Sequence, residues 1–169
     1  MKTHAGFTLI ELMTTLVVST TLISIAIPSL SSLYQAYRAD SAIRTIRSTL
    51  QLARNSAISY GSRVTACPLL EGACTQDWRI GITIFIDRGD PNTIDGSDQV
   101  LLTTDRFHQG DNVTYNRSAV RFQPDGLASG TNGTLRYCPG SVSSEHSKAV
   151  IINQAGKIRF SKDSNIRCN

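Results

Sequence analysis

The sequence predicts an α+β protein in which one long N-terminal helix packs on an antiparallel sheet. Residues 7–27 form an almost unbroken apolar run, and residues 39–60 continue with apolar side chains at helical spacing. Short runs rich in β-forming residues follow Gly61 and are separated by turn residues. With 169 residues, 40% of them hydrophobic and 18% charged, the chain suits one domain with an appendage and is too apolar for low-complexity disorder.

The apolar run of residues 7–27 is long enough, at about 1.5 Å per residue, to cross a hydrocarbon layer of about 30 Å. Its hydroxyl side chains can donate hydrogen bonds to the preceding helical turn; they are Thr14, Thr15, Ser19, Thr20, Thr21 and Ser24. No small-residue cleavage site follows the run, so we expect the segment to stay attached to the chain.

Glu11 is the one formal charge in this run, and placing a carboxylate there costs about 2.5–3.5 kcal/mol. If the chain is cut after Gly6, the new α-amino group of Phe7 is a cation at neutral pH, because such groups have a pKa near about 8. Since Glu11 lies a full turn from its own terminus, pairing with the amine of an adjacent chain is easier. The pair therefore predicts a helical polymer.

The segment Gly6-Phe7-Thr8-Leu9-Ile10-Glu11-Leu12 resembles the class III signal of type IV pilins and type II secretion pseudopilins. The resemblance implies a pilin fold, cleavage between Gly6 and Phe7 by a prepilin peptidase, and N-methylation of Phe7. It also implies that the helix resides in the inner membrane and is later extracted into a filament, where Glu11 contacts a neighbouring N-terminus. Residues 1–6 are then the cleaved leader and residues 7–30 the transmembrane or filament-core helix. Pro28 should bend this helix, because proline interrupts the helical hydrogen-bond ladder.

The helix is expected to continue through an amphipathic half, residues 31–61, into a β-rich head, residues 62–169. One stripe of apolar side chains should lie on the sheet: Ala39, Ile43, Ile46, Leu50, Ala53, Ala57 and Tyr60. Gly61 can adopt the left-handed backbone conformation that ends many helices, so we expect the helix to end there. Arg44, Arg47 and Arg54 lie off the stripe, and we expect them on a solvated face.

The runs expected to be strands are residues 63–69, 78–87, 100–107, 113–116, 120–123, 134–138, 149–152 and 157–161. Residues 153–156 form the expected hairpin loop between the last two runs, with Gly156 supplying a positive φ. The C-terminal half is similar to the GspH/FimT family, which includes FimU-like minor pilins; the segments that carry this similarity are residues 121–130, 133–135 and 150–159. Residues 71–111 are the least similar part.

Four cysteines allow three disulfide pairings, and a head delivered across the inner membrane meets an oxidising compartment. We expect Cys67 to pair with Cys74, because these residues flank a short loop, and Cys138 to pair with Cys168, which ties the tail to a strand. Both bonds should be structural, each contributing about 2–4 kcal/mol.

Charge is unevenly distributed, since residues 71–111 hold eight acids and three bases whereas residues 112–169 hold eight bases and three acids. One interpretation is complementarity between subunits, in which an acidic edge of one meets a basic edge of the next. The other is contact with DNA phosphates, which gives salt-dependent, sequence-independent binding. The candidate DNA-binding residues are Lys157, Arg159, Lys162 and Arg167.

Some FimT-type pilins, which this chain resembles, bind DNA in natural transformation through a C-terminal Gly-Arg-x-Arg motif. The matching positions here are Gly156, Lys157, Ile158 and Arg159. Lys157 keeps the positive charge of the first arginine but lacks its bidentate fork, and no aromatic platform for stacked bases accompanies the motif.

No catalytic, metal or cofactor site is expected. The sequence lacks C-x-x-C and H-E-x-x-H, and no serine lies in a G-x-S-x-G frame. Residues 87–98 carry four carboxylates whose spacing misses the EF-hand pattern, so a solvated turn is the favoured interpretation and calcium binding the alternative.

The expected function is that of a minor type IV pilin, a non-catalytic structural protein that helps initiate assembly of a pilus filament and caps it. Two alternatives stay open: a FimT-like DNA-binding minor pilin for DNA uptake, and a GspH-like minor pseudopilin of a type II secretion system. The implied partners are other minor pilins, the major pilin, the prepilin peptidase, the inner-membrane assembly platform and, in the first alternative, double-stranded DNA. The implied location is the inner membrane, with a single span and a periplasmic head, and then the extracellular pilus of a Gram-negative bacterium.

Overall fold

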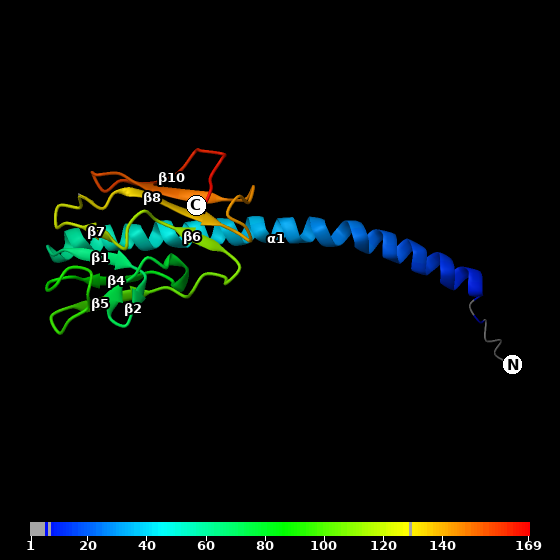
Figure 1. Cartoon of the computed structure of the whole chain (residues 1–169), viewed down its shortest axis with the longest axis horizontal. Coiled ribbons are helices and arrows are strands. Elements are labelled where there is room, and N and C mark those ends of the chain that lie inside the picture. The colour runs from blue at the N-terminus through cyan, green and yellow to red at the C-terminus, as the bar shows by residue number, and fades with distance from the viewer. Residues whose placement is uncertain (1–5, 7, 129) are drawn as a thin grey trace. The chain divides into compact units, whose positions relative to one another are not determined.

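A computed structural model describes residue 6, residues 8–128 and residues 130–169 of the chain. Phe7, the expected first residue of the processed chain, lies outside the described residues. The chain divides into two compact units, Met1–Gln35 and Ala36–Asn169. One helix, α1 (Leu9–Tyr60), contributes residues to both units (Figure 1).

The first unit contains the N-terminal part of α1, which Thr8 caps. The hydroxyl oxygen of Thr8 accepts a hydrogen bond from the amide of Glu11 at 3.3 Å, and its carbonyl oxygen accepts one from the amide of Leu12 at 3.1 Å. Thr-x-x-Glu is the sequence of a capping box, so Glu11 occupies a helical position that favours an acid on local grounds as well.

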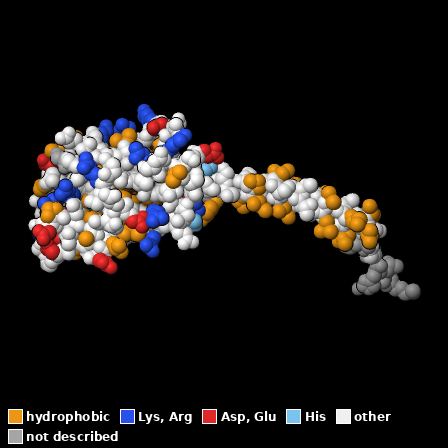
Figure 2. Space-filling view, viewed as in Figure 1, with side chains coloured by type: hydrophobic (Ala, Val, Ile, Leu, Met, Phe, Trp, Pro, Cys, Tyr) orange, Lys and Arg blue, Asp and Glu red, His pale blue; other side chains and the backbone are white. Residues whose placement is uncertain are grey.

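Five of the six hydroxyl side chains in residues 14–24 of this part of α1 donate hydrogen bonds to carbonyl oxygens of the preceding turn, as expected; Ser19 is the exception. Thr14 donates to the carbonyl oxygen of Glu11 at 3.0 Å, and Thr20 donates to that of Leu16 at 2.9 Å. In the described part of the chain, α1 is the one helix long and apolar enough to cross a membrane, and its apolar side chains are exposed along this part (Figure 2). Pro28 lies inside α1 without ending it, and a bend at this residue stays a prediction.

In the second unit, α1 presents the predicted apolar stripe to the interior. The first six residues of the stripe, Ala39, Ile43, Ile46, Leu50, Ala53 and Ala57, are almost completely buried. The prediction is wrong for Tyr60, which is 54% exposed, because it is the last helical residue and the chain leaves the packed surface there. The amides of Gly61 and Ser62 donate to the carbonyl oxygens of Ile58 and Ala57, and Gly61 has a φ of +57°, which together form a Schellman motif.

Two four-stranded antiparallel sheets and a short hairpin make up the rest of the head (Figure 1). The strand order is β5-β4-β1-β7 in the first sheet and β10-β9-β8-β6 in the second, and β2 pairs with β3. The strands are β1 (Val64–Cys67), β2 (Leu69–Leu70), β3 (Ala73–Cys74), β4 (Thr83–Ile86), β5 (Gln99–Thr103), β6 (Asn112–Thr114), β7 (Val120–Phe122), β8 (Gly133–Cys138), β9 (Lys148–Ile152) and β10 (Ile158–Phe160). This arrangement confirms the predicted α+β class with one long helix.

Three features of the head differ from the predicted strands. In the run predicted over residues 100–107 the strand, β5, ends at Thr103. The run predicted over residues 78–87 begins with a 3-10 helix, η1 (Trp78–Ile80), and only its later part is a strand, β4. Gly81 separates the two with a φ of +105°, and a Cβ atom there would lie 2.8 Å from the carbonyl oxygen of Thr104. The β2–β3 hairpin has no counterpart among the predicted strands, because two-residue strands carry no periodic pattern.

One hydrophobic core joins α1 to both sheets. Ile84 and Val120 of the first sheet and Leu135 and Val150 of the second sheet belong to the same buried cluster as the helical stripe. Every buried residue of that cluster lies at Ala39 or beyond it in the chain. The second unit therefore holds the complete core.

Two disulfides lie in smaller hydrophobic clusters outside the main core. The bonds are Cys67–Cys74 and Cys138–Cys168, which is the pairing expected from the sequence. The first bond packs beside Phe85 and ties the β2–β3 hairpin to the first sheet. The second ties the C-terminal tail to β8, where Ile166 covers Ala149 on the outer face of the second sheet.

The edge strands are short or irregular. In the pairing of β4 with β5, Ile84 faces Leu102 and Phe85 faces Val100, so Leu101 is an extra residue in the edge strand. At the edge of the second sheet, β10 has only three residues.

Candidate functional site

The last hairpin places basic side chains on the outer face of the second sheet. Lys157 and Arg159 are exposed, whereas Ile158 between them is only 8% exposed and belongs to the core. In the pairing of β9 with β10, Arg159 lies opposite Ile151. Successive side chains of a strand point to opposite faces, so Arg159 points away from α1.

Arg136 adds a base to this outer face that the sequence analysis missed. Its neighbours Leu135 and Tyr137 are buried in the core, so Arg136 of β8 projects to the other side. Arg136 and Arg167 line one hollow of about 420 Å³, and Asp163 adds one acid to its lining. The alternation of Leu135, Arg136 and Tyr137 was the available sequence signal. We call Arg136, Arg159 and Arg167 the basic face.

Lys157 belongs to a different hollow. It lies with Arg54 and Gln51 around a space of about 560 Å³ between α1 and the start of β10. Gly156 has a φ of +72°, and a Cβ atom there would lie 1.9 Å from the carbonyl oxygen of Gly126. The hairpin thus turns tightly against the loop after β7. No contact in the described part of the chain joins Lys162 to the other candidate residues.

The expectation that Arg44, Arg47 and Arg54 form a solvated face holds only for Arg44. The guanidinium of Arg47 stacks over the ring of Phe160, 4.7 Å from its centroid. The Nε of Arg54 donates to the carbonyl oxygen of Gly126 at 3.1 Å. These two arginines fasten α1 to the second sheet and to the β7–β8 loop, because residues just off the apolar stripe still reach the rims of the packed surface.

The acidic segment is less acidic at its surface than its composition suggests. Asp87 is buried and pairs with Arg63 at 2.6 Å, and Asp111 is buried and pairs with Arg38 at 2.6 Å. Asp111 also accepts from the amide of Gly140 at 3.0 Å and from the hydroxyl of Tyr137, whose pKa burial raises. Both acids therefore stabilise the head and do not contribute to an exposed acidic surface.

The acidic loop of residues 87–98 uses its carboxylates to hold its own backbone. Asp95 accepts from the amide of Asp90 at 3.1 Å and from the hydroxyl of Ser97 at 2.6 Å, and the latter bond holds the pKa of Asp95 below its usual value. Asp98 accepts from the amide of Arg88 at 2.7 Å. No cluster of three potential metal ligands occurs among the described residues, and the structure gives no support to calcium binding in this loop.

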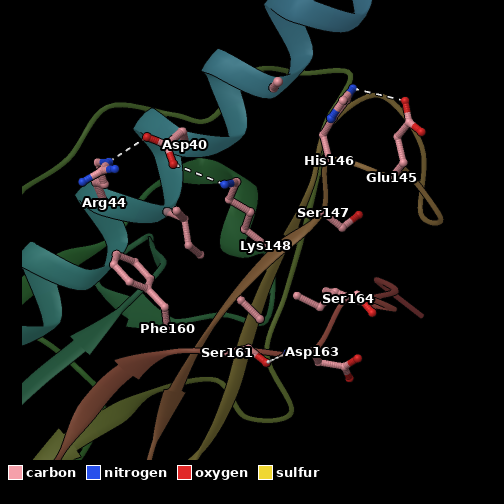
Figure 3. A pocket seen from close by; sticks show the side chains of 14 residues that line it. Asp40, Arg44, Glu145, His146, Ser147, Lys148, Phe160, Ser161, Asp163 and Ser164 are labelled. Carbon is pink, nitrogen blue, oxygen red and sulfur yellow. Dashed lines mark hydrogen bonds and ion pairs between the residues drawn. The ribbon is translucent and has the colours of Figure 1, made fainter.

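Another pocket, of about 490 Å³, lies between α1, the loop that leads into β9 and the segment that follows β10 (Figure 3). Asp40 accepts from Arg44 at 2.7 Å and from Lys148 at 3.2 Å, and these two bonds hold the pKa of Asp40 below its usual value. Glu145 lies 3.4 Å from His146 at the opposite rim. Apart from Asp163, which accepts from the amide of Asn165 at 2.9 Å, the charged side chains that line this pocket are paired with one another, which is typical of a structural contact between elements.

The processing segment is only partly described. Gly6 is exposed, and no atom lies within 4 Å of the Cβ position that a larger residue would have there. Glu11 is exposed, and among the described residues its carboxylate has no ion-pair partner. The roles of Gly6 and Phe7 in cleavage and of Glu11 in assembly stay predictions.

Comparison with protein-family models decides the family of the head. The model described as type II transport protein GspH matches residues 42–156. The chain belongs to the GspH family. A second model, described as the prokaryotic N-terminal methylation motif, matches residues 1–27 of this GspH-family chain. Both matches agree with the resemblance found in the sequence.

Solved structures share the fold of this GspH-family chain. The type IV minor pilin FimU of Pseudomonas aeruginosa is 20% identical, with a TM-score of 0.61 over 78% of this chain and 95% of that structure. The minor pseudopilin EpsH of the Vibrio cholerae type 2 secretion system is 14% identical, with a TM-score of 0.50 over 73% of this chain and 96% of that structure. No curated protein sequence matches the chain.

Proposed function

We propose that this GspH-family chain is a minor type IV pilin that helps initiate assembly of a pilus filament and caps it. One observation carries the proposal. An N-terminal methylation motif and an exposed apolar helix precede a head whose fold is shared with the minor pilin FimU. The TM-score is 0.61 with FimU and 0.50 with EpsH, which favours the pilus over the secretion machine.

In this proposal the two units have separate tasks. The first unit anchors the chain in the inner membrane until the prepilin peptidase has cut between Gly6 and Phe7. The platform then moves the helix into the filament, where Glu11 pairs with the amine of a neighbouring subunit. The head, with a closed core and two disulfides, stays folded in the periplasm and later outside the cell, and it contacts other minor pilins and the major pilin.

Deletion and complementation in the native host test the proposed function. Fibres sheared from cells that lack the chain should be few, and the wild-type chain should restore them. Glu11→Ala should restore them poorly because it removes the carboxylate, whereas Thr15→Ala, one turn further along the helix, serves as the matched control. Normal numbers of fibres without the chain would overturn the proposal. Loss of protein secretion with intact fibres would favour the pseudopilin alternative.

The basic face supports a second candidate function, the uptake of double-stranded DNA. Arg136, Arg159 and Arg167 come from β8, β10 and the tail and lie on one outer face. A surface of this kind contacts phosphates without reading sequence. The isolated head, residues 36–169, is a suitable probe because it holds the whole core and both disulfides.

A gel shift of this head with duplex DNA of arbitrary sequence tests the second candidate. Binding should weaken as salt rises, and Arg136→Ala combined with Arg159→Ala should reduce both the affinity and the salt slope, by about one unit of slope for each lost phosphate contact. Arg106→Ala removes an exposed arginine outside the basic face and should leave binding unchanged. Equal binding by both variants would remove this candidate.

A further inference from the structure

A second basic feature lies on the first sheet, where the chain passes from β6 to β7. It is a hollow of about 290 Å³, lined by Gln76, Asn92, Asn116, Arg117, Ser118, Ala119, Arg121, Gly130 and Thr131. We call it the arginine hollow. Among the described residues that line it, Arg117 and Arg121 are the charged ones, and none is an acid. Its volume is at the lower end of the range of small-molecule pockets, about 300–1,000 Å³, and suits one or two side chains.

The backbones of both arginines are fixed, whereas their guanidinium groups are unpaired. The carbonyl oxygen of Arg117 accepts from the indole nitrogen of the buried Trp78 at 2.9 Å. The hydroxyl of Thr131 accepts from the amide of Arg121 at 3.0 Å and donates to its carbonyl oxygen at 3.1 Å. In the described part of the chain, neither guanidinium has an ion pair or hydrogen bond. Each guanidinium group is therefore carried by a fixed backbone and is not engaged by another described residue.

The remaining polar groups of the hollow are mostly side-chain amides, which both donate and accept. The carboxamide oxygen of Asn92 is buried and is therefore not accessible to a ligand in the hollow. A nucleic-acid backbone is bound through several phosphates along an extended basic surface, whereas two arginines are the bases that line this hollow. A single side-chain carboxylate therefore matches the hollow better than a nucleic-acid backbone does.

We propose that the arginine hollow binds an acidic side chain, Asp or Glu, of a neighbouring subunit, with Arg117 and Arg121 as the guanidinium donors. Guanidinium groups bind carboxylates through paired, charge-assisted hydrogen bonds, which suits a geometrically defined contact. The partner is a subunit because the inference rests on the proposed function in a filament. The contact adds a basic docking point on the first sheet, separate from the basic face on the second sheet.

Charge reversal in the full chain tests the partner. Arg117→Glu combined with Arg121→Glu should reduce recovery of the chain in sheared fibres at least about tenfold, since it replaces attraction by repulsion across an interface. Arg106 is exposed and lies outside the hollow, so Arg106→Glu is the control and should leave recovery in fibres unchanged. The amount of each variant in the membrane should equal that of the wild-type chain. Equal recovery of both variants would overturn the inference. Absence of the wild-type chain from fibres would instead overturn the proposed function.

Nuclear magnetic resonance of the isolated head tests the chemistry of the hollow independently of any filament. N-acetyl-glutamate N-methylamide should give saturable shifts of the Arg117 and Arg121 guanidinium signals at constant ionic strength, and Arg121→Gln should abolish them. Inorganic phosphate is the comparison probe. A stronger response to phosphate would overturn the carboxylate assignment, and no saturable response to either probe would overturn the site.

Discussion

At the scale of single residues, the head is held by buried carboxylates that each connect distant parts of the chain. Asp111 links Arg38 on α1 to the hydroxyl of Tyr137 on β8 and to the amide of Gly140. A buried charge whose partner is removed is costly because the desolvation penalty is no longer compensated. These side chains are therefore more sensitive to substitution than the exposed acids of the same segment.

Asp111→Asn should lower the free energy of unfolding of the head by about 3 kcal/mol, because the amide cannot compensate the Arg38 guanidinium. Urea denaturation of residues 36–169 at neutral pH measures the change. Asp105→Asn replaces an exposed acid of the same segment and should change stability by less than about 0.5 kcal/mol. A loss of similar size in both variants would contradict the assigned role of Asp111.

The Asp40 carboxyl should titrate below its ordinary pKa of 3.8, because Arg44 and Lys148 bond to its ionised form. A pKa that is lower in the folded than in the unfolded state adds stability above the unfolded value, and this stability is lost as pH falls through the folded value. Carboxyl-carbon magnetic resonance titration should show the low pKa in the wild-type head and a return toward 3.8 in Arg44→Ala combined with Lys148→Ala. An unchanged pKa in that variant would contradict the assigned cause. The effect on stability is small, since exposed ion pairs contribute about 0.2–1 kcal/mol.

At the scale of elements, the periodic parts of the fold could be predicted and the aperiodic parts could not. The helical stripe and the strand alternation follow from side-chain spacing, so α1, the β9–β10 hairpin and most strands were predictable. Neither η1 nor the β2–β3 hairpin has a periodic pattern of apolar side chains that would predict it. Trp78 takes its place in η1 through a long-range bond to Arg117, which local sequence does not reveal.

The same limit applies to the candidate sites. Lys157 and Arg159 stand out because they alternate with apolar residues along the chain, whereas Arg136 comes to share the outer face with Arg159 only when β8 pairs with β9 and β9 with β10. Arg117 and Arg121 entered the sequence analysis only in the count of bases over residues 112–169. Their shared hollow depends on η1 and on the loop after β7, which no local pattern specifies.

Gly156→Ala should destabilise the head by about 2 kcal/mol or more, because the residue has a positive φ and a Cβ atom would strike the carbonyl oxygen of Gly126. Gly96→Ala is the matched control, since its φ is not positive and no atom lies within 4 Å of the added Cβ position. Urea denaturation of both variants measures the difference. Equal stability of the two variants would contradict the prediction, because it would show that the hairpin backbone shifts enough to remove the clash with Gly126 at no cost in free energy.

At the scale of the whole molecule, the second unit buries its apolar residues and the first unit exposes them. The second unit closes a complete core within residues 36–169. The first unit leaves its large apolar side chains exposed, from Leu9 at 74% to Leu30 at 67%. Such a surface requires lipid or other helices around it.

The head of residues 36–169 should therefore unfold at the same urea concentration as the head within the full, detergent-solubilised chain. It should also be a water-soluble monomer, whereas the full chain should require detergent. Near-ultraviolet circular dichroism and sedimentation in a matched detergent background measure both properties. A lower midpoint for the isolated head would show that the first unit contributes to the core.

The extra residue in β5 and the brevity of β10 have a consequence for how such heads recognise one another. A long, regular edge strand can pair through its amide and carbonyl groups with any extended peptide, and such pairing is nonspecific. Here the borders present few aligned groups, so we expect association between heads to depend on side chains such as those of the arginine hollow. In that case individual side chains determine which partner is bound, and we expect a change of charge at one of them to alter the choice of partner.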